Sequence, residues 1–281
     1  MDETQQSRKA FAALVALPDD AIDLAQASLL IAREEYPDLE VGRYLGMLDE
    51  MGAAIRERLR GGEGFGSLIA HLNRLLFEER GFRGNQQEYF DPRNSFLNDV
   101  LDRRVGIPIS LSAVYLEVAR RIGCPLAGVA FPGHFLVRYM GRDAPSEVLI
   151  DPFNRGRILT EDDCRALLRT LFEGRIPFRP ELLKRARTRD ILERMLVNLK
   201  AIYKARSDFH RALRVQHLLL CIHPDRPEEI RDRAIIYYSL ACFEQAAADL
   251  GAYLDLAPGA GDAEEIRKRR ALLERLAPRW S

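Results

Sequence analysis

Apolar residues recur every three to four positions through the first part of the chain, which predicts a run of amphipathic helices. The pattern covers residues 21–35, 43–60 and 67–79. Pro37 and the glycine-rich stretch at residues 61–64 separate these segments, because both residue types interrupt a helical pattern. The N-terminal region is therefore expected to be helical up to about residue 80.

The hydrophobic period changes further along the chain. Residues 95–102 and 109–121 still follow a helical pattern. Runs rich in β-branched and aromatic residues then predict strands at residues 126–131, 135–139 and 148–150. One long helix packed on a small antiparallel sheet is the expected core, so the predicted fold class is α+β.

A repeat of 34 residues runs through the C-terminal part of the chain. Five residues recur in one register: Tyr203, Phe209, Ala212, Leu220 and Pro224 return as Tyr237, Phe243, Ala246, Leu254 and Pro258. This period is typical of tetratricopeptide helix-turn-helix repeats, and a polar helix at residues 263–276 is expected to cap the stack. We therefore expect two domains, residues 1–180 with a core at about 81–180, and residues 186–281.

Composition excludes several functional classes. Lys and Arg number 42, as do Asp and Glu, so no net charge draws the chain towards nucleic acid or an anionic membrane. The four cysteines show no C-x-x-C spacing and the five histidines show no ligand spacing, so neither a metal nor another cofactor is expected. With neither an N-terminal signal nor a long apolar span in the sequence, a cytoplasmic location is expected.

Candidate chemistry centres on the start of the helix at residues 109–121. Cysteine hydrolases place a Cys at a helix N-terminus, where a His activates it and an Asp or Asn orients that His. Here Pro108 occupies the first helical turn and offers neither a thiol nor an N–H, whereas His134 and Asp151 follow later. Ser110 could form a serine triad with His134 and Asp151. It lies two residues beyond position 108, however, and is therefore rotated by about 200° from that position around the helix axis. A structural hydrogen bond between neighbouring strands is the simpler interpretation of the His–Asp pair.

Four strings carry a resemblance to a known family: Tyr89–Ser95, Val100–Ile109, Pro132–Arg138 and Ile150–Phe153. With them the chain resembles the bacterial SirB-type family, in which a transglutaminase-like domain of the papain-like cysteine protease type precedes tetratricopeptide-like repeats. The resemblance implies that Pro108 stands at the nucleophile position. It also implies that His134 and Asp151 correspond to the base and to its orienting carboxylate.

Three functions are compatible with these features. The preferred one is a non-catalytic regulator or adaptor that binds a protein or peptide through the degenerate cleft and the concave face of the repeats, with no membrane partner and nucleic acid unlikely as a partner. The first alternative is an amide or peptide hydrolase or an acyltransferase that uses Ser110 or a partner's thiol with His134 and Asp151. The second is a small-molecule sensor that uses the cleft. The residues expected to line this cleft are Asn85, Tyr89, Asp91, Arg93 and Asn94.

Overall fold

The computed structural model describes residues 3–144 and 147–276, which divide into two compact units. The core unit comprises residues 17–195, and the repeat unit comprises residues 1–16 together with residues 196–281. The domain boundary expected from the sequence places residues 1–16 in the first domain. Helix α1 (Glu3–Val15) instead packs on α9 (Phe209–Ile222) and buries Phe11, which explains why the N-terminus belongs to the repeat unit. The outermost ends of both expected domains, residues 1–2 and 277–281, lie outside the described residues.

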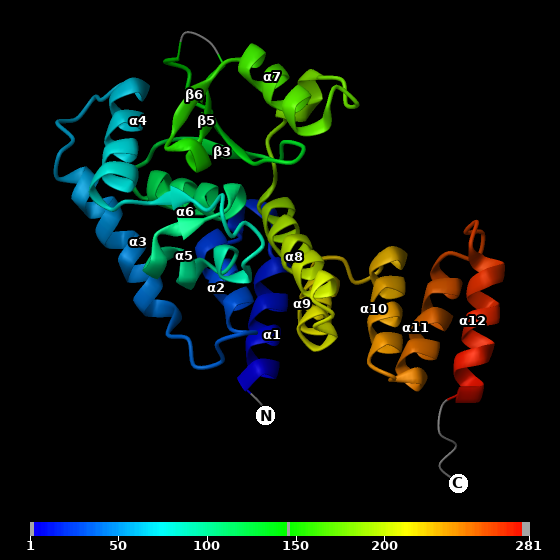
Figure 1. Ribbon diagram of the computed structural model, residues 1–281. Coiled ribbons are helices and arrows are strands. Elements are labelled where there is room, and N and C mark those ends of the chain that lie inside the picture. The colour runs from blue at the N-terminus through cyan, green and yellow to red at the C-terminus, as the bar shows by residue number, and fades with distance from the viewer. Residues whose placement is uncertain (1–2, 145–146, 277–281) are drawn as a thin grey trace. The chain divides into compact units, whose positions relative to one another are not determined.

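The core unit combines helices with short strands, and it confirms the α+β fold class (Figure 1). Its helices are α2 (Leu24–Ala32), α3 (Val41–Arg56), α4 (Phe65–Asn73), the π-helical segment η2 (Arg74–Glu79), α5 (Leu97–Arg103), α6 (Pro108–Arg121), α7 (Glu161–Phe172) and the first part of α8 (Thr188–Ala205). Its strands are β1 (Arg83–Gly84), β2 (Val105–Gly106), β3 (Leu126–Val129), β4 (Leu136–Tyr139), β5 (Leu149–Asp151) and β6 (Arg157–Leu159). The three strands expected from the sequence are β3, β4 and β5.

A small antiparallel sheet of the core unit lies between the helices α6 and α7. Its strands follow the order β3-β4-β5-β6 within the described residues. Because side chains alternate along a strand, Leu136 and Leu149 pack with Cys164 and Leu168 of α7 on one face. The intervening residues of β4 and β5 face α6, which contacts β3 and β4. The sheet is thus covered on both faces.

Helix α6 is buried along almost its whole length, from Pro108 to Ala119. The burial includes the carboxyl group of Glu117, which is only 3% exposed. Its Oε2 accepts hydrogen bonds from Arg121 at 2.6 Å and from Arg120 at 2.9 Å. Arg121 also bonds Asp49 of α3 at 2.6 Å. This network fixes the C-terminal half of α6 against its neighbours.

The repeat unit consists of packed helices. Besides α1, it contains the end of α8, α9 (Phe209–Ile222), α10 (Pro227–Ser239), α11 (Phe243–Leu256) and α12 (Ala263–Leu276). Ala212 and Ala246, which occupy one register of the repeat, are both fully buried, and such small residues allow neighbouring helices to approach closely. Among the described residues, no helix has the length and apolar character needed to cross a membrane.

Replacing Glu117 with alanine is expected to lower the free energy of unfolding of the core unit by about 3 kcal/mol, because it removes the buried carboxylate that pairs with the buried guanidinium of Arg121 and leaves only an exposed partner. Urea unfolding followed by circular dichroism measures this change. The control Asp49→Ala removes an exposed partner of the same arginine and should cost no more than about 1 kcal/mol. Equal costs for the two variants would contradict the role given to Glu117.

Candidate functional site

The N-terminus of α6 is the position at which the sequence predicted a degenerate catalytic site. Hydrogen bonds of the Ser110 hydroxyl hold this helix end in place. Pro108 is the first residue of α6 and is buried. The Oγ of Ser110, which is fully buried, accepts a hydrogen bond from the backbone N–H of Ile107 at 3.0 Å. The hydroxyl lies 2.5 Å from the carbonyl oxygen of Asn94 and 3.2 Å from that of Ile107. Because a hydroxyl carries one proton, donation to these carbonyls leaves none for a catalytic base.

The structure brings His134 and Asp151 together. His134 follows the turn before β4, Asp151 ends β5, and the two residues are 7% and 2% exposed. Nε2 of His134 lies 3.0 Å from Oδ2 of Asp151. The N–H direction deviates from the line between these atoms, so Nε2 has no well-aligned hydrogen-bond partner. The pair is therefore a close contact at hydrogen-bond distance rather than an ideal hydrogen bond.

Asp151 also performs a structural task. Its carboxylate accepts hydrogen bonds from the backbone N–H groups of Phe153 at 3.1 Å and Asn154 at 3.2 Å, and from Nδ2 of Asn154 at 2.7 Å. It thereby caps the 3-10 turn η4 (Pro152–Asn154). Burial alone raises the pKa of the Asp151 carboxyl, but the contacts with His134 and Asn154 outweigh burial and hold this pKa below its usual value. Asp151 is therefore a carboxylate at neutral pH.

Aromatic rings cover the histidine. The ring of Phe153 meets His134 edge to face, with 5.8 Å between centroids. Tyr89 meets Phe153 in the same way at 6.4 Å, and burial raises the pKa of the Tyr89 hydroxyl. Gly84 makes room for this arrangement, since a Cβ atom there would lie 2.5 Å from the ring of Phe153. Phe153 thus packs against the histidine ring.

The other expected cleft residues hold their own loop together. The side-chain amide of Asn94, which is fully buried, donates to the carbonyl oxygens of Glu88 at 2.7 Å and Tyr89 at 3.2 Å, and accepts from Asn85 at 3.1 Å. Asp91 caps the next turn by accepting from the backbone N–H of Arg93 at 3.0 Å. Its carboxylate also pairs with the guanidinium of Arg93 at 2.8 Å. These polar groups mainly serve the fold of residues 85–94.

The two thiols of the core unit are poor candidates for a nucleophile. Burial raises the pKa of Cys124 to about 12 and that of Cys164 to about 11, so both remain protonated at neutral pH. Both side chains are buried. In the described part of the chain, no group of three or more His, Cys, Asp or Glu side chains is arranged to hold a metal ion.

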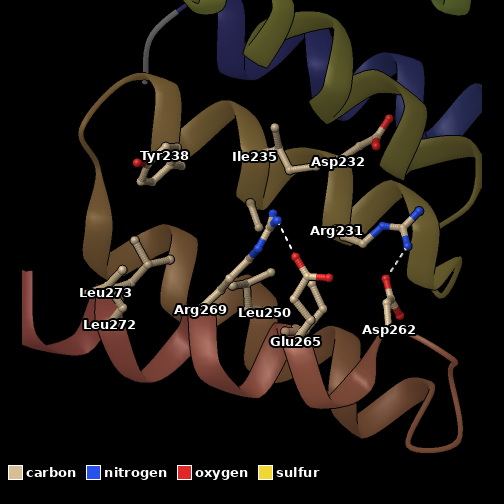
Figure 2. Close-up of a pocket in the computed structure, with 12 residues that line it drawn as sticks. Arg231, Asp232, Ile235, Tyr238, Leu250, Asp262, Glu265, Arg269, Leu272 and Leu273 are labelled. Carbon is tan, nitrogen blue, oxygen red and sulfur yellow. Dashed lines mark hydrogen bonds and ion pairs between the residues drawn. The ribbon is translucent and has the colours of Figure 1, made fainter.

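The repeat unit contains a concave surface that we call the repeat groove (Figure 2). It has a volume of about 630 Å³ and lies between α10 and α12. Three large apolar side chains reach its surface: Ile235 is 41% exposed, Tyr238 57% and Leu272 46%. Its charged side chains are paired, Arg231 with Asp262 at 2.6 Å and Arg269 with Glu265. The groove therefore offers an apolar surface beside neutralised charges.

Sequence reasoning missed several of these features. Phe153 and Asn154 escaped notice as partners of His134 and Asp151, although Asp-Pro directly after a strand is a turn signal that points to capping by the aspartate. Ile235 and Tyr238 escaped notice because periodicity alone does not separate a buried helix face from an exposed one. The exposed positions are defined only when neighbouring helices pack.

Comparison with known proteins agrees with this architecture. Residues 42–197 match the transglutaminase-like superfamily and residues 199–271 match the tetratricopeptide repeat. A UPF0162 protein of Xylella fastidiosa (strain 9a5c) is 39% identical over 90% of this chain and 91% of its own length. Protein SirB1 of Salmonella typhimurium is 32% identical over 71% of this chain and 73% of its own length. Human F-box only protein 21 is 31% identical over 62% of this chain and 28% of its own length, and no solved structure matches the chain.

Replacing Asp151 with asparagine is expected to lower stability in a pH-dependent way. Because the folded-state pKa of Asp151 is lowered, its ionised form stabilises the folded chain above the unfolded-state pKa of 3.8, and this stability is lost as the pH falls through the folded-state value. The difference in unfolding free energy between wild type and Asp151→Asn should therefore be constant from about pH 5 to 7 and shrink below about pH 4. Urea unfolding at several pH values measures it. The exposed control Asp162→Asn should leave the pH dependence unchanged, whereas a wild-type–Asp151→Asn difference independent of pH would contradict the role of the Asp151 carboxylate.

Proposed function

Since the chain belongs to the transglutaminase-like bacterial family that includes SirB1 and the UPF0162 proteins, we propose that it is a non-catalytic regulator or adaptor that binds a protein or peptide. The binding surface in this proposal is the repeat groove. The transglutaminase-like part acts as a structural domain. Four free cysteines support a cytoplasmic location, because unpaired thiols are typical of reducing compartments.

The observation that carries the proposal is the absence of a nucleophile at the start of α6. Pro108 stands where the family resemblance places the catalytic cysteine, and a pyrrolidine ring can neither attack an acyl carbon nor donate an N–H to an oxyanion. Ser110, the nearest hydroxyl in the sequence, gives its proton to backbone carbonyls. The contact between His134 and Asp151 then acts on the fold rather than on a substrate.

The repeat groove supports the binding role. Interfaces derive most of their affinity from a few large side chains that become fully desolvated, and tyrosine is prominent among them. Tyr238 and Ile235 lie exposed in the groove, and Leu272 approaches from α12 (Figure 2). An apolar segment of a partner would bury all three.

A hydrolase or acyltransferase is the second candidate, because His134 and Asp151 keep the 3.0 Å separation that a catalytic pair needs. It requires a nucleophile from Ser110 or from a partner's thiol. The 7% exposure of His134 and the ring of Phe153 against it weigh against this candidate. The same burial weighs against a small-molecule sensor at the cleft.

Purified wild-type protein is expected to hydrolyse p-nitrophenyl acetate no faster than the His134→Ala variant. The reason is that no nucleophilic side chain next to His134 is available for activation. Absorbance of the released nitrophenolate measures both rates at equal protein concentration. Circular dichroism of the variant confirms that it is folded. Turnover by the wild type that His134→Ala abolishes would contradict the proposal.

The double variant Ile235→Asp with Tyr238→Asp is expected to lose a partner that the wild-type chain captures from its native cell extract. Loss of two central contacts should weaken binding by at least about 30-fold, equivalent to about 2 kcal/mol. Quantitative mass spectrometry of captured proteins measures the loss. The matched control is Leu256→Asp, which alters a side chain of α11 that is 46% exposed and does not line the groove. A partner retained by the groove variant would contradict the proposed binding surface.

A further inference from the structure

A second groove, in the core unit, is strongly acidic, and we call it the acidic groove. It has a volume of about 660 Å³ and lies among the turn after α2, the start of α3 and helix α5. Five carboxylates line it against a single guanidinium, that of Arg43. These carboxylates belong to Glu35, Asp38, Glu40, Asp99 and Asp102.

Two tyrosines form walls of the acidic groove. The hydroxyl of Tyr36 donates to Oδ2 of Asp99 at 2.7 Å, and the hydroxyl of Tyr44 donates to Oδ2 of Asp102 at 2.7 Å. Each carboxylate has a second oxygen that can still accept a hydrogen bond. Burial raises the pKa of Asp99 and outweighs the opposing effects of the hydrogen bond from Tyr36 and of the charges on Arg103 and Arg93. A bound cation would offset that unfavourable burial.

The polar lining is rich in acceptors. Asn98 lines the groove and is 5% exposed, and its Oδ1 has no hydrogen-bond partner among the described residues. Asp38 and Glu40 are exposed at the rim. A ligand that carries several donors and a positive charge therefore complements this surface.

The side chain of Arg43 already contacts both an aromatic ring and a carboxylate of the acidic groove. The guanidinium of Arg43 lies 5.2 Å from the centroid of the Tyr44 ring and 3.7 Å from Oδ1 of Asp102. Its side chain is 62% exposed, so it neutralises only part of the groove. Arginine suits such a site better than lysine, because its planar group stacks on an aromatic ring while donating to carboxylates.

We propose that the acidic groove binds an arginine side chain within a basic segment of a protein partner. The carboxylates of Asp99 and Asp102 accept the guanidinium hydrogen bonds, the ring of Tyr36 contacts its apolar stem, and Asp38 and Glu40 attract neighbouring positive charges. This site is separate from the repeat groove and does not depend on the function proposed for that groove.

A labelled peptide tests the proposal on the full chain. The probe is a fluorescein-labelled, amidated peptide of sequence Ala-Arg-Ala-Arg-Ala, and fluorescence anisotropy at low ionic strength measures its dissociation constant. The comparison peptide replaces each arginine with citrulline, which keeps the shape but removes the charge. We expect saturable binding of the arginine peptide below about 1 mM and at least about ten-fold weaker binding of the citrulline peptide.

Two pairs of charge reversals locate the site. Asp38→Lys with Glu40→Lys should weaken binding by at least about ten-fold. The matched control, Asp20→Lys with Asp162→Lys, makes the same change in net charge at side chains that are 90% and 97% exposed and lie outside the acidic groove, and it should change binding by less than about two-fold. The isosteric variant Asp102→Asn should also weaken binding by about ten-fold, and circular dichroism checks that each variant is folded.

Three results would overturn the proposal. The first is the absence of saturable binding of the arginine peptide. The second is equal binding of the citrulline peptide or of the corresponding lysine peptide. The third is an equal loss in both pairs of charge reversals, which would indicate a general electrostatic effect. The variant Ile235→Asp with Tyr238→Asp should bind the peptide like wild type, so failure of this proposal is distinguishable from failure of the adaptor proposal.

Discussion

The hydroxyl of Ser110 connects the start of α6 to the loop of residues 85–94. It accepts from the N–H of Ile107 and lies 2.5 Å from the carbonyl oxygen of Asn94, in a position without solvent exposure. Gly106 is required beside it, because a Cβ atom there would lie 2.7 Å from the Ser110 oxygen. The side chain of Asn94 then holds the turns of its own loop. One buried hydroxyl thus joins the start of α6 to the loop that precedes α5.

The pair of His134 and Asp151, which we propose to be non-catalytic, also has a structural role. Asp151 caps a turn while it faces His134, and Phe153 from that turn covers the histidine ring. Removing the aspartate would therefore disturb local structure even where no substrate binds. Retention of a His–Asp pair in such a domain is consistent with a structural role, and the interaction surfaces that we propose lie elsewhere, in the repeat groove and the acidic groove.

Periodicity in the sequence predicted most of the fold but few of the contacts. The 34-residue register predicted the helices of the repeat unit, and the change of hydrophobic period predicted β3, β4 and β5. Strand β6 was not predicted because it lies at the edge of the sheet and only Leu159 of its three residues is buried, so it lacks the apolar run that indicates a strand. The position of α1 was not predicted because an amphipathic helix does not specify its partner. The family resemblance indicated His134 and Asp151. The distance between them, however, depends on the turn before β4 and the turn after β5, which the sequence pattern does not specify. The acidic groove was missed because Tyr36 and Asp99 are 63 positions apart in the sequence.

The most direct test of the central claim is covalent labelling of the wild-type chain with a fluorophosphonate, followed by intact-mass and peptide mass spectrometry. An activated serine attacks such a phosphorus centre, whereas a serine whose proton is held by backbone carbonyls does not. The account predicts no adduct on Ser110 under conditions in which a serine hydrolase reacts completely. A stoichiometric adduct on Ser110 that disappears in His134→Ala would contradict it.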